Sequence, residues 1–146
     1  MKKLHTDILI DASADRVWEV LSDFAAFPEW NPFLRAVEGD LTAGSKLEVR
    51  IQPEGDTGMT FKPTVLKAEP GQELRWLGRL IMPGLFDGEH YFIIESIGDG
   101  QVRFIQGEQF SGVLVPIMAL MGIFKNTEKG FGDMNQALKA RAEQAA

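Results

Sequence analysis

The sequence contains no cysteine and only two histidines, His5 and His90. Without cysteine the chain has no disulfide framework, no thiol nucleophile and no thiolate metal ligand. A structural zinc site needs several converging ligands, which two distant histidines do not supply. The carboxylates of Asp87, Glu89 and Glu108 are oxygen donors, but they are not spaced as in a calcium-binding loop. We therefore expect neither a metal nor a cofactor.

Motifs for phosphate binding and for nucleophilic catalysis are also missing. The sequence has no Walker motif, no GxGxxG turn between a strand and a helix, and no GxSxG elbow. Its net charge is −6, and no basic cluster in the sequence offsets it. Because nucleic-acid binding depends mainly on neutralising phosphates, this charge argues against a nucleic-acid partner.

Long apolar runs are scarce as well. The longest nearly continuous one, Val113 to Phe124, has about twelve residues, whereas a membrane-spanning helix needs roughly 20. The basic start of the chain lacks the apolar stretch of a signal peptide, because Asp7 and Asp11 interrupt it. We expect a cytoplasmic protein without stable membrane insertion.

What is present predicts a single domain over residues 1–146, since 45% of the residues are hydrophobic and no repeat occurs. A strand is expected first, at Leu4–Ile10, and then a helix whose N-cap is Ser13. A second short helix and an aromatic loop bracketed by prolines follow. The apolar face of the first helix comprises Val17, Val20, Leu21 and Phe24.

Turn signals divide the middle of the chain into short segments rich in β-branched and aromatic residues, which predict antiparallel strands. With the first strand they make seven. A long C-terminal helix follows, on the spacing of Ile117, Met121, Phe124, Glu128, Phe131, Met134 or Asn135, Leu138 and Ala142. At Gly122 and Gly130 we expect a bend or a close contact, because glycine disfavours a helix. The predicted strands after the first are Leu34–Glu38, Lys46–Gln52, Met59–Ala68, Glu73–Ile81, Glu89–Ile97 and Gln101–Phe110.

Four stretches carry a resemblance to a known family: ILIDASADRVWEVLSDFAAFPEWNPFL from Ile8, LRWLG from Leu74, GEHYFII from Gly88 and QGEQFSG from Gln106. In their order, and with the closing helix, they resemble the SRPBCC or START-like superfamily, especially its bacterial polyketide cyclase and lipid-transport-like branch. The resemblance implies an α+β helix-grip fold, in which a curved seven-stranded antiparallel sheet wraps around the C-terminal helix and leaves an internal cavity. It implies a cavity more securely than a reaction.

The candidate ligand-binding residues are mostly large apolar side chains on the expected inner face of the sheet, on the loops and on the closing helix. The same residues would also serve as an ordinary core. Three polar residues, His90, Gln106 and Glu108, share that face, and neighbouring strands bring His90 within reach of the other two. They are candidates for ligand orientation or proton transfer, with a structural hydrogen-bond network as the alternative. The apolar candidates are Trp30, Phe33, Phe61, Trp76, Leu80, Phe86, Phe92, Phe104, Phe110, Leu114, Met118, Met121 and Phe124.

These observations favour a carrier or sensor that binds a small hydrophobic or amphipathic molecule, lipid-like or polyketide-like, between sheet and helix. One alternative is a cofactor-independent cyclase or dehydratase in which His90 or Glu108 transfers a proton. Another is a protein-interaction module, and a homodimer through the apolar helix surface also stays open.

Overall fold

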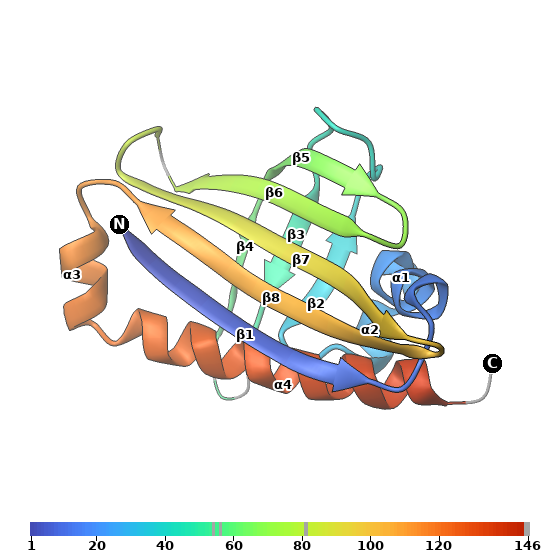
Figure 1. Ribbon diagram of the computed structural model, residues 1–146. Helices are drawn as coiled ribbons and strands as arrows, with labels where there is room; N and C mark the ends of the chain where they lie inside the picture. The colour runs from blue at the N-terminus through green and yellow to red at the C-terminus, as the bar shows by residue number, and fades with distance from the viewer. Residues whose placement is uncertain (54, 56, 81, 145–146) are drawn as a thin grey trace.

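A five-stranded and a three-stranded antiparallel sheet pack with one long helix (Figure 1). The computed structural model describes residues 1–53, 55, 57–80 and 82–144. Within them the elements are β1 (Lys2–Ile10), α1 (Ala14–Ser22), the 3-10 turn η1 (Phe24–Ala26), α2 (Phe27–Trp30), β2 (Leu34–Glu38), β3 (Glu48–Ile51), β4 (Met59–Phe61), β5 (Thr64–Glu69), β6 (Glu73–Leu80), β7 (Phe86–Gly98), β8 (Gln101–Ser111), α3 (Val115–Leu120) and α4 (Ile123–Glu143).

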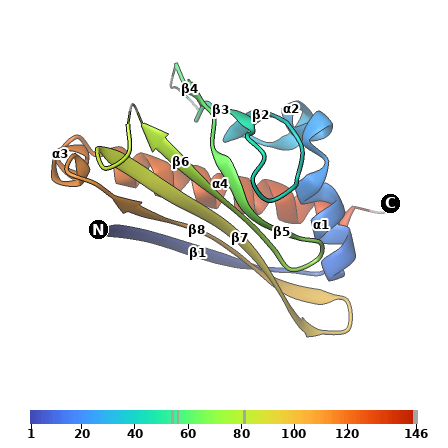
Figure 2. The same cartoon turned by 90° about the horizontal axis from the view of Figure 1, so that it is seen from above.

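The larger sheet has the strand order β1-β8-β7-β6-β5 and the smaller one β2-β3-β4. Helix α4 and the smaller sheet lie on the same side of the larger sheet (Figure 2), and α4 packs against β1 and β8. The predicted α+β class, with an antiparallel sheet and a long C-terminal helix, is therefore confirmed. No helix among the residues described here has the length and apolar character needed to cross a bilayer.

Helix α1 forms as its sequence predicts. The Ser13 hydroxyl accepts a hydrogen bond from the backbone N–H of Arg16 at 3.1 Å, which satisfies a free donor of the first turn. Val17, Val20 and Leu21 are buried, as expected for its apolar face. Phe24 does not belong to that face, because α1 ends at Ser22 and Phe24 begins η1.

The strand expected over Met59–Ala68 is two strands that belong to different sheets. β4 ends at Phe61 and β5 begins at Thr64, so the described part of the chain has eight strands where the sequence predicted seven. Pro63 lies in the gap, where a residue without a backbone N–H cannot continue a ladder. An isolated bridge between Lys46 and Thr64 links the two sheets.

The C-terminal helix is interrupted at the first of the two predicted glycines. Gly122 has a φ of +75° and separates α3 from α4, because the left-handed conformation ends a right-handed helix. The predicted stripe is buried in α4, apart from the exposed Glu128, but it is not buried in α3. Ile117 and Met121 are exposed, whereas the buried positions of α4 include Phe124, Phe131, Met134, Asn135, Leu138 and Ala142.

At the second glycine, Gly130, the helix makes the predicted close contact. A Cβ atom there would lie 2.3 Å from Cδ1 of Phe33, so only glycine lets the aromatic ring of Phe33 approach the helix. Phe33 packs edge-on against Phe131, with ring centroids 5.6 Å apart.

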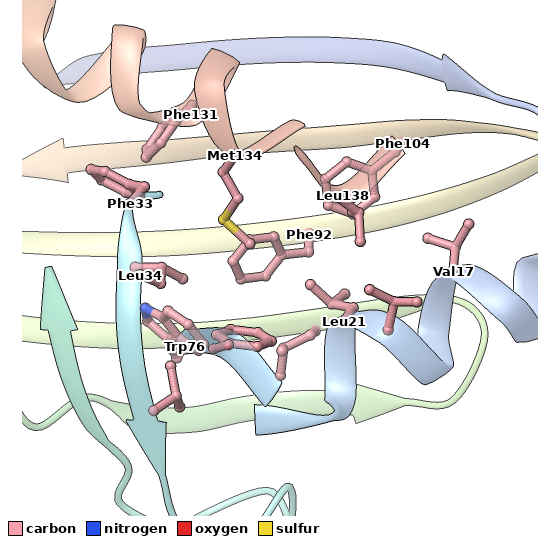
Figure 3. Close-up of a cluster of buried hydrophobic side chains, with 14 of the residues drawn as sticks. Val17, Leu21, Phe33, Leu34, Trp76, Phe92, Phe104, Phe131, Met134 and Leu138 are labelled. Carbon is pink, nitrogen blue, oxygen red and sulfur yellow. The ribbon is translucent and has the colours of Figure 1, made fainter. Parts of the chain in front are cut away.

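The core lies between the larger sheet and a cover formed by α4, α1 and the smaller sheet (Figure 3). Phe92 and Phe104 of the larger sheet face Met134 and Leu138 of α4. Trp76 lies nearer to Leu34 and to α1. All of them are almost fully buried. Because α4 fills this half of the sheet with side chains, the remaining open space lies toward the α3 end.

Candidate functional site

A cavity of about 330 Å³ lies between the ends of β6, β7 and β8, the β3–β4 hairpin, and the junction of α3 with α4. This volume is at the lower end of the range found for small-molecule pockets. The sequence-predicted residues that line it are Phe33, Phe61, Leu80, Phe86, Glu108, Phe110 and Met118. Further lining residues, not predicted as site residues, are Ile51, Pro53, Gly58, Met59, Gly78, Arg79, Gly88, Ile123, Asn126 and Thr127.

The other predicted residues lie outside the cavity wall. Trp76, Phe92 and Phe104 are packed into the core, where side chains of α4, α1 and β2 occupy the space expected to be open. Phe124 is buried and contacts both Phe86 and Phe110, whose rings stack on each other. The remaining apolar candidates lie nearer the surface: Trp30 and Leu114 are half-buried, and Met121 is 66% exposed.

Two paired glycines make room for the cavity. Gly78 of β6 and Gly88 of β7 are register partners, and both line the space. A Cβ atom at Gly88 would lie 2.1 Å from Oε2 of Glu108, and one at Gly78 would lie 3.2 Å from the ring of Phe61. Glycine inside a strand often marks the close approach of another group. The two glycines were therefore a signal in the sequence for the position of the site, and the sequence-based prediction did not use it.

Among the described residues that line the cavity, Glu108 supplies the one carboxyl, and Arg79, Asn126 and Thr127 are the other charged or polar side chains. His90 and Glu108 are register partners on β7 and β8, and Nδ1 of His90 lies 3.2 Å from Oε1 of Glu108. His90 is 3% exposed, so Glu108 stands between the imidazole and the cavity. No hydrogen bond to Oε2 of Glu108 is found among the described residues, which leaves this oxygen available to a ligand.

A chain of hydrogen bonds runs from His90 away from the cavity. Nε2 of His90 lies 3.0 Å from Oε1 of Gln106, and Nε2 of Gln106 donates to Oδ1 of Asn135 at 2.7 Å. Nδ2 of Asn135 donates to Oγ1 of Thr6 at 2.9 Å, and the Thr6 hydroxyl donates to the backbone carbonyl of Gln106 at 2.7 Å. The predicted contacts of His90 with both Gln106 and Glu108 are therefore present.

The direction of this chain fixes the proton on one histidine nitrogen. A backbone carbonyl only accepts, so the Thr6 hydroxyl must donate to it, and Asn135 must then present its NH₂ group to Thr6. The Gln106 amide is oriented in turn, because its Nε2 also faces the carbonyl of Phe131 at 3.4 Å. Oε1 of Gln106 accepts, and Nε2 of His90 therefore carries a hydrogen.

The contact between His90 and Glu108 needs one more proton. With Nε2 of His90 already protonated, a hydrogen bond between Nδ1 and Oε1 requires a hydrogen on one of these two atoms. The pair then carries no net charge, whichever atom holds the hydrogen. The arrangement joins the buried imidazole to a carboxyl in the cavity wall, and the hydrogen bond at Nε2 holds the imidazole in one orientation.

The described residues contain no group of three or more His, Asp or Glu side chains that could hold a metal ion. His5, the second histidine, contacts the Tyr91 hydroxyl at 3.1 Å through its Nδ1 and takes no part in the His90 chain.

The family model described as polyketide cyclase/dehydrase and lipid transport matches residues 1–143. The chain belongs to this family. None of the curated proteins matches the sequence significantly.

Solved structures share the family's fold at low sequence identity. The aromatase/cyclase ZhuI from Streptomyces sp. R1128 is 17% identical with a TM-score of 0.78, over 97% of this chain and 93% of that one. A START superfamily protein from Mycobacterium smegmatis is 19% identical with a TM-score of 0.73, over 97% of each chain. The di-domain aromatase/cyclase BexL, from the BE-7585A biosynthetic pathway, is 17% identical with a TM-score of 0.76, over 98% of this chain. The chain spans only 47% of the BexL chain. At these identities the likeness shows the fold alone.

Sequence reasoning also missed two members of the polar chain, Thr6 and Asn135. Asn135 had a signal, because an amide within the apolar stripe of a buried helix needs partners. Thr6 had none of its own, since a threonine in a strand is ordinary. Its role follows only from its register opposite Gln106.

Proposed function

We propose that this family member binds a small apolar or amphipathic molecule in the cavity, with the polar group of the ligand at Glu108. The observation that carries the proposal is a largely apolar cavity with one carboxyl in its wall, whose Oε2 has no described protein partner. Apolar pockets with a few placed polar groups are typical of small-molecule sites. The proposed contacts are Phe33, Phe61, Leu80, Phe86, Phe110 and Met118 for the apolar part, and Glu108 for the polar part.

The expected affinity is modest. Burial of a ligand with ten methylene equivalents contributes about 8 kcal/mol gross, from roughly 0.8 kcal/mol for each buried group. Association costs at least about 4 kcal/mol in lost motion, which leaves at most about 4 kcal/mol and a dissociation constant of about 1 mM. A well-matched hydrogen bond at Glu108 adds selectivity more than strength.

The carboxyl of Glu108 favours a neutral ligand group beside it, although the cationic Arg79 also lines the cavity. A hydroxyl or phenol can donate to Oε2 of Glu108, whereas a carboxylate placed there would bring two acceptors together. We therefore expect 1-naphthol to bind more tightly than 1-naphthoate, although the two have similar apolar rings.

Titration calorimetry with these two probes tests the proposal. Glu108→Gln should bring the two affinities closer together, because a neutral amide accepts or donates. Glu95→Gln is the matched control, since Glu95 is exposed on the same strand pair outside the cavity. Absence of naphthol binding at millimolar concentration, or equal discrimination in both variants, would contradict the proposal. Native mass spectrometry of the purified protein, followed by organic extraction, would identify any bound molecule directly.

A second candidate function is a cofactor-independent cyclase or dehydratase. The observation that favours it is the 3.2 Å contact between Nδ1 of the buried His90 and Oε1 of Glu108, a residue that lines the cavity. In such a reaction Glu108 would accept a proton from a carbon next to a carbonyl, or from a hydroxyl. His90 would stabilise the change in charge at Glu108 through their hydrogen bond. His90→Gln should then abolish turnover of an identified substrate while binding persists. Unchanged turnover in that variant would exclude the proton-transfer role.

A further inference from the structure

An apolar surface covers the end of the molecule at α3. We call it the tip patch, and it consists of Met82, Val113, Ile117, Leu120 and Met121. These side chains are 53% to 90% exposed, and Leu120 is the most exposed. Scattered single apolar residues are common on protein surfaces, but a contiguous apolar patch usually marks an interaction site.

Two segments distant in sequence are held together to build the tip patch. The backbone N–H of Val113 donates to the carbonyl of Gly84 at 3.0 Å, and that of Leu114 to the carbonyl of Leu85 at 2.9 Å. These bonds tie the β6–β7 connection to the start of α3, at the end of the molecule that also holds the N-terminus (Figure 1). No residue of α3 is buried. The apolar side chains of α3 therefore contribute little to the core.

Three exposed lysines lie at this end, although the chain as a whole has a net charge of −6. Lys2 and Lys3 begin β1 beside α3, and Lys125 lies in the first turn of α4; all three are exposed. Nζ of Lys2 lies 5.9 Å from the centre of the Phe124 ring, which places this cation at the edge of the tip. Two carboxylates lie in the same region: Asp87, whose Oδ2 accepts from the N–H of Gly84 at 3.2 Å, and the exposed Glu128 of α4.

Negative charge gathers at the opposite end. Asp11 and Asp15 flank the start of α1, and Glu95 and Asp99 lie on the distal part of the β7–β8 hairpin (Figure 1). Basic residues also lie at that end, among them Arg16 of α1 and Arg103, the register partner of Glu95. A negatively charged surface attracts the lysines at the tip and repels the carboxylates of the opposite end.

We infer that the tip patch docks on the surface of a lipid bilayer that carries anionic headgroups. The apolar side chains enter the boundary of the acyl chains, and Lys2, Lys3 and Lys125 meet the headgroups. A second copy of the chain fits the surface less well. A two-fold axis through the patch would place the lysines of both copies around one interface, where like charges repel.

The tip patch also adjoins the cavity. Met118 of α3 and Leu80 at the end of β6 line the cavity, and both belong to segments that carry the patch. Docking would bring the cavity close to the acyl region. The docking itself stands on the exposed side chains and the charges, and it does not depend on the proposed function.

Flotation of the purified protein with lipid vesicles tests the inference. Vesicles of equal parts phosphatidylcholine and phosphatidylglycerol should bind the protein, and vesicles of phosphatidylcholine alone should bind it more weakly. Leu120→Ser with Met121→Ser should lower the partition coefficient about tenfold or more, because apolar surface no longer leaves water. Lys2→Gln with Lys3→Gln should lower binding to the anionic vesicles by about fivefold per lysine, and salt should weaken wild-type binding.

Ile97→Ser is the matched control, since Ile97 is 44% exposed near the acidic end of the molecule. It should leave vesicle binding unchanged. Circular dichroism checks that each variant is folded. We expect all of them to fold, because the substituted side chains are exposed. Failure of the wild type to bind anionic vesicles would overturn the inference. So would equal vesicle binding by the tip variant and the Ile97 control, or a dimer that the tip substitutions convert to a monomer.

Discussion

Gly130 and Gly132 offer a sharp test of the packing between α4 and the cavity wall. Both lie inside α4, two residues apart. A Cβ atom at Gly130 would lie 2.3 Å and 2.4 Å from two ring carbons of Phe33, whereas one at Gly132 would meet nothing within 4 Å. The same substitution, glycine to alanine, therefore has opposite consequences at the two positions.

The magnitudes follow from two competing effects. Alanine is favoured over glycine in a helix by up to about 1 kcal/mol, and Gly132→Ala should raise the free energy of unfolding by roughly this amount. At Gly130 the same gain is opposed by overpacking against a ring that is 2% exposed, which typically costs about 1 to 3 kcal/mol. Gly130→Ala should therefore be less stable than Gly132→Ala by about 1 to 3 kcal/mol.

Urea denaturation, with the midpoint and slope fitted for each variant, measures this difference. Phe33→Leu should reduce the cost of Gly130→Ala in a double-mutant cycle, because the smaller side chain relieves the overlap. Phe33 also lines the cavity, so Gly130→Ala should weaken naphthol binding in the folded protein. If Gly130→Ala were as stable as Gly132→Ala, the close approach of Phe33 to α4 would be refuted.

Burial raises the pKa of Tyr91 above the ordinary value of 10.0, and the nearby charge of Arg75 offsets this only in part. The folded protein thus holds this proton more tightly, so its contribution to stability is complete below pH 10 and is lost as the pH rises through the folded pKa. Tyr91 is the only tyrosine, and absorbance of the tyrosinate should show a higher midpoint in the folded protein than in urea; an equal or lower midpoint would contradict this. Trp76→Ala should destabilise the fold by about 3 to 5 kcal/mol through cavity formation. Trp76→Phe removes an indole N–H that is buried without a hydrogen-bond partner among the described residues, so it should cost much less than Trp76→Ala. Equal losses for the two variants in thermal or urea unfolding would argue against a packing role. Nitrogen NMR of the histidines should find hydrogen on Nε2 of His90, and a form protonated only on Nδ1 would refute the orientation of Gln106.

The parts of the fold that follow local rules could be predicted from the sequence. Side chains alternate along a strand, and a short turn at 98–100 fixes the register of β7 against β8. This is why His90 could be placed beside Gln106 and Glu108 before the structure was known. The cap at Ser13 and the break at Gly122 are equally local, since each depends on one residue and its immediate neighbours.

The position of the cavity could not be predicted, because it depends on where the cover of the sheet ends. Trp76 and Phe86 are both large aromatic residues on strands, and the sequence does not tell them apart. In the structure α1 and β2 cover Trp76, whereas Phe86 lines the cavity. The exposure of Met121 was missed for a related reason. An apolar stripe shows which face of a helix is apolar, but it does not show whether another element packs against that face.

The closed circuit of hydrogen bonds among Thr6, Gln106 and Asn135 joins β1, β8 and α4 at a single point. A shift of α4 by one residue along the sheet would break the two hydrogen bonds of Asn135 in this circuit. The buried amide groups would then lack partners, which costs about 1 to 3 kcal/mol for each group. The circuit therefore holds α4 in one register against the sheet. We expect any movement that admits a ligand to occur in α3, which precedes Gly122 and lies outside this circuit, and not along α4.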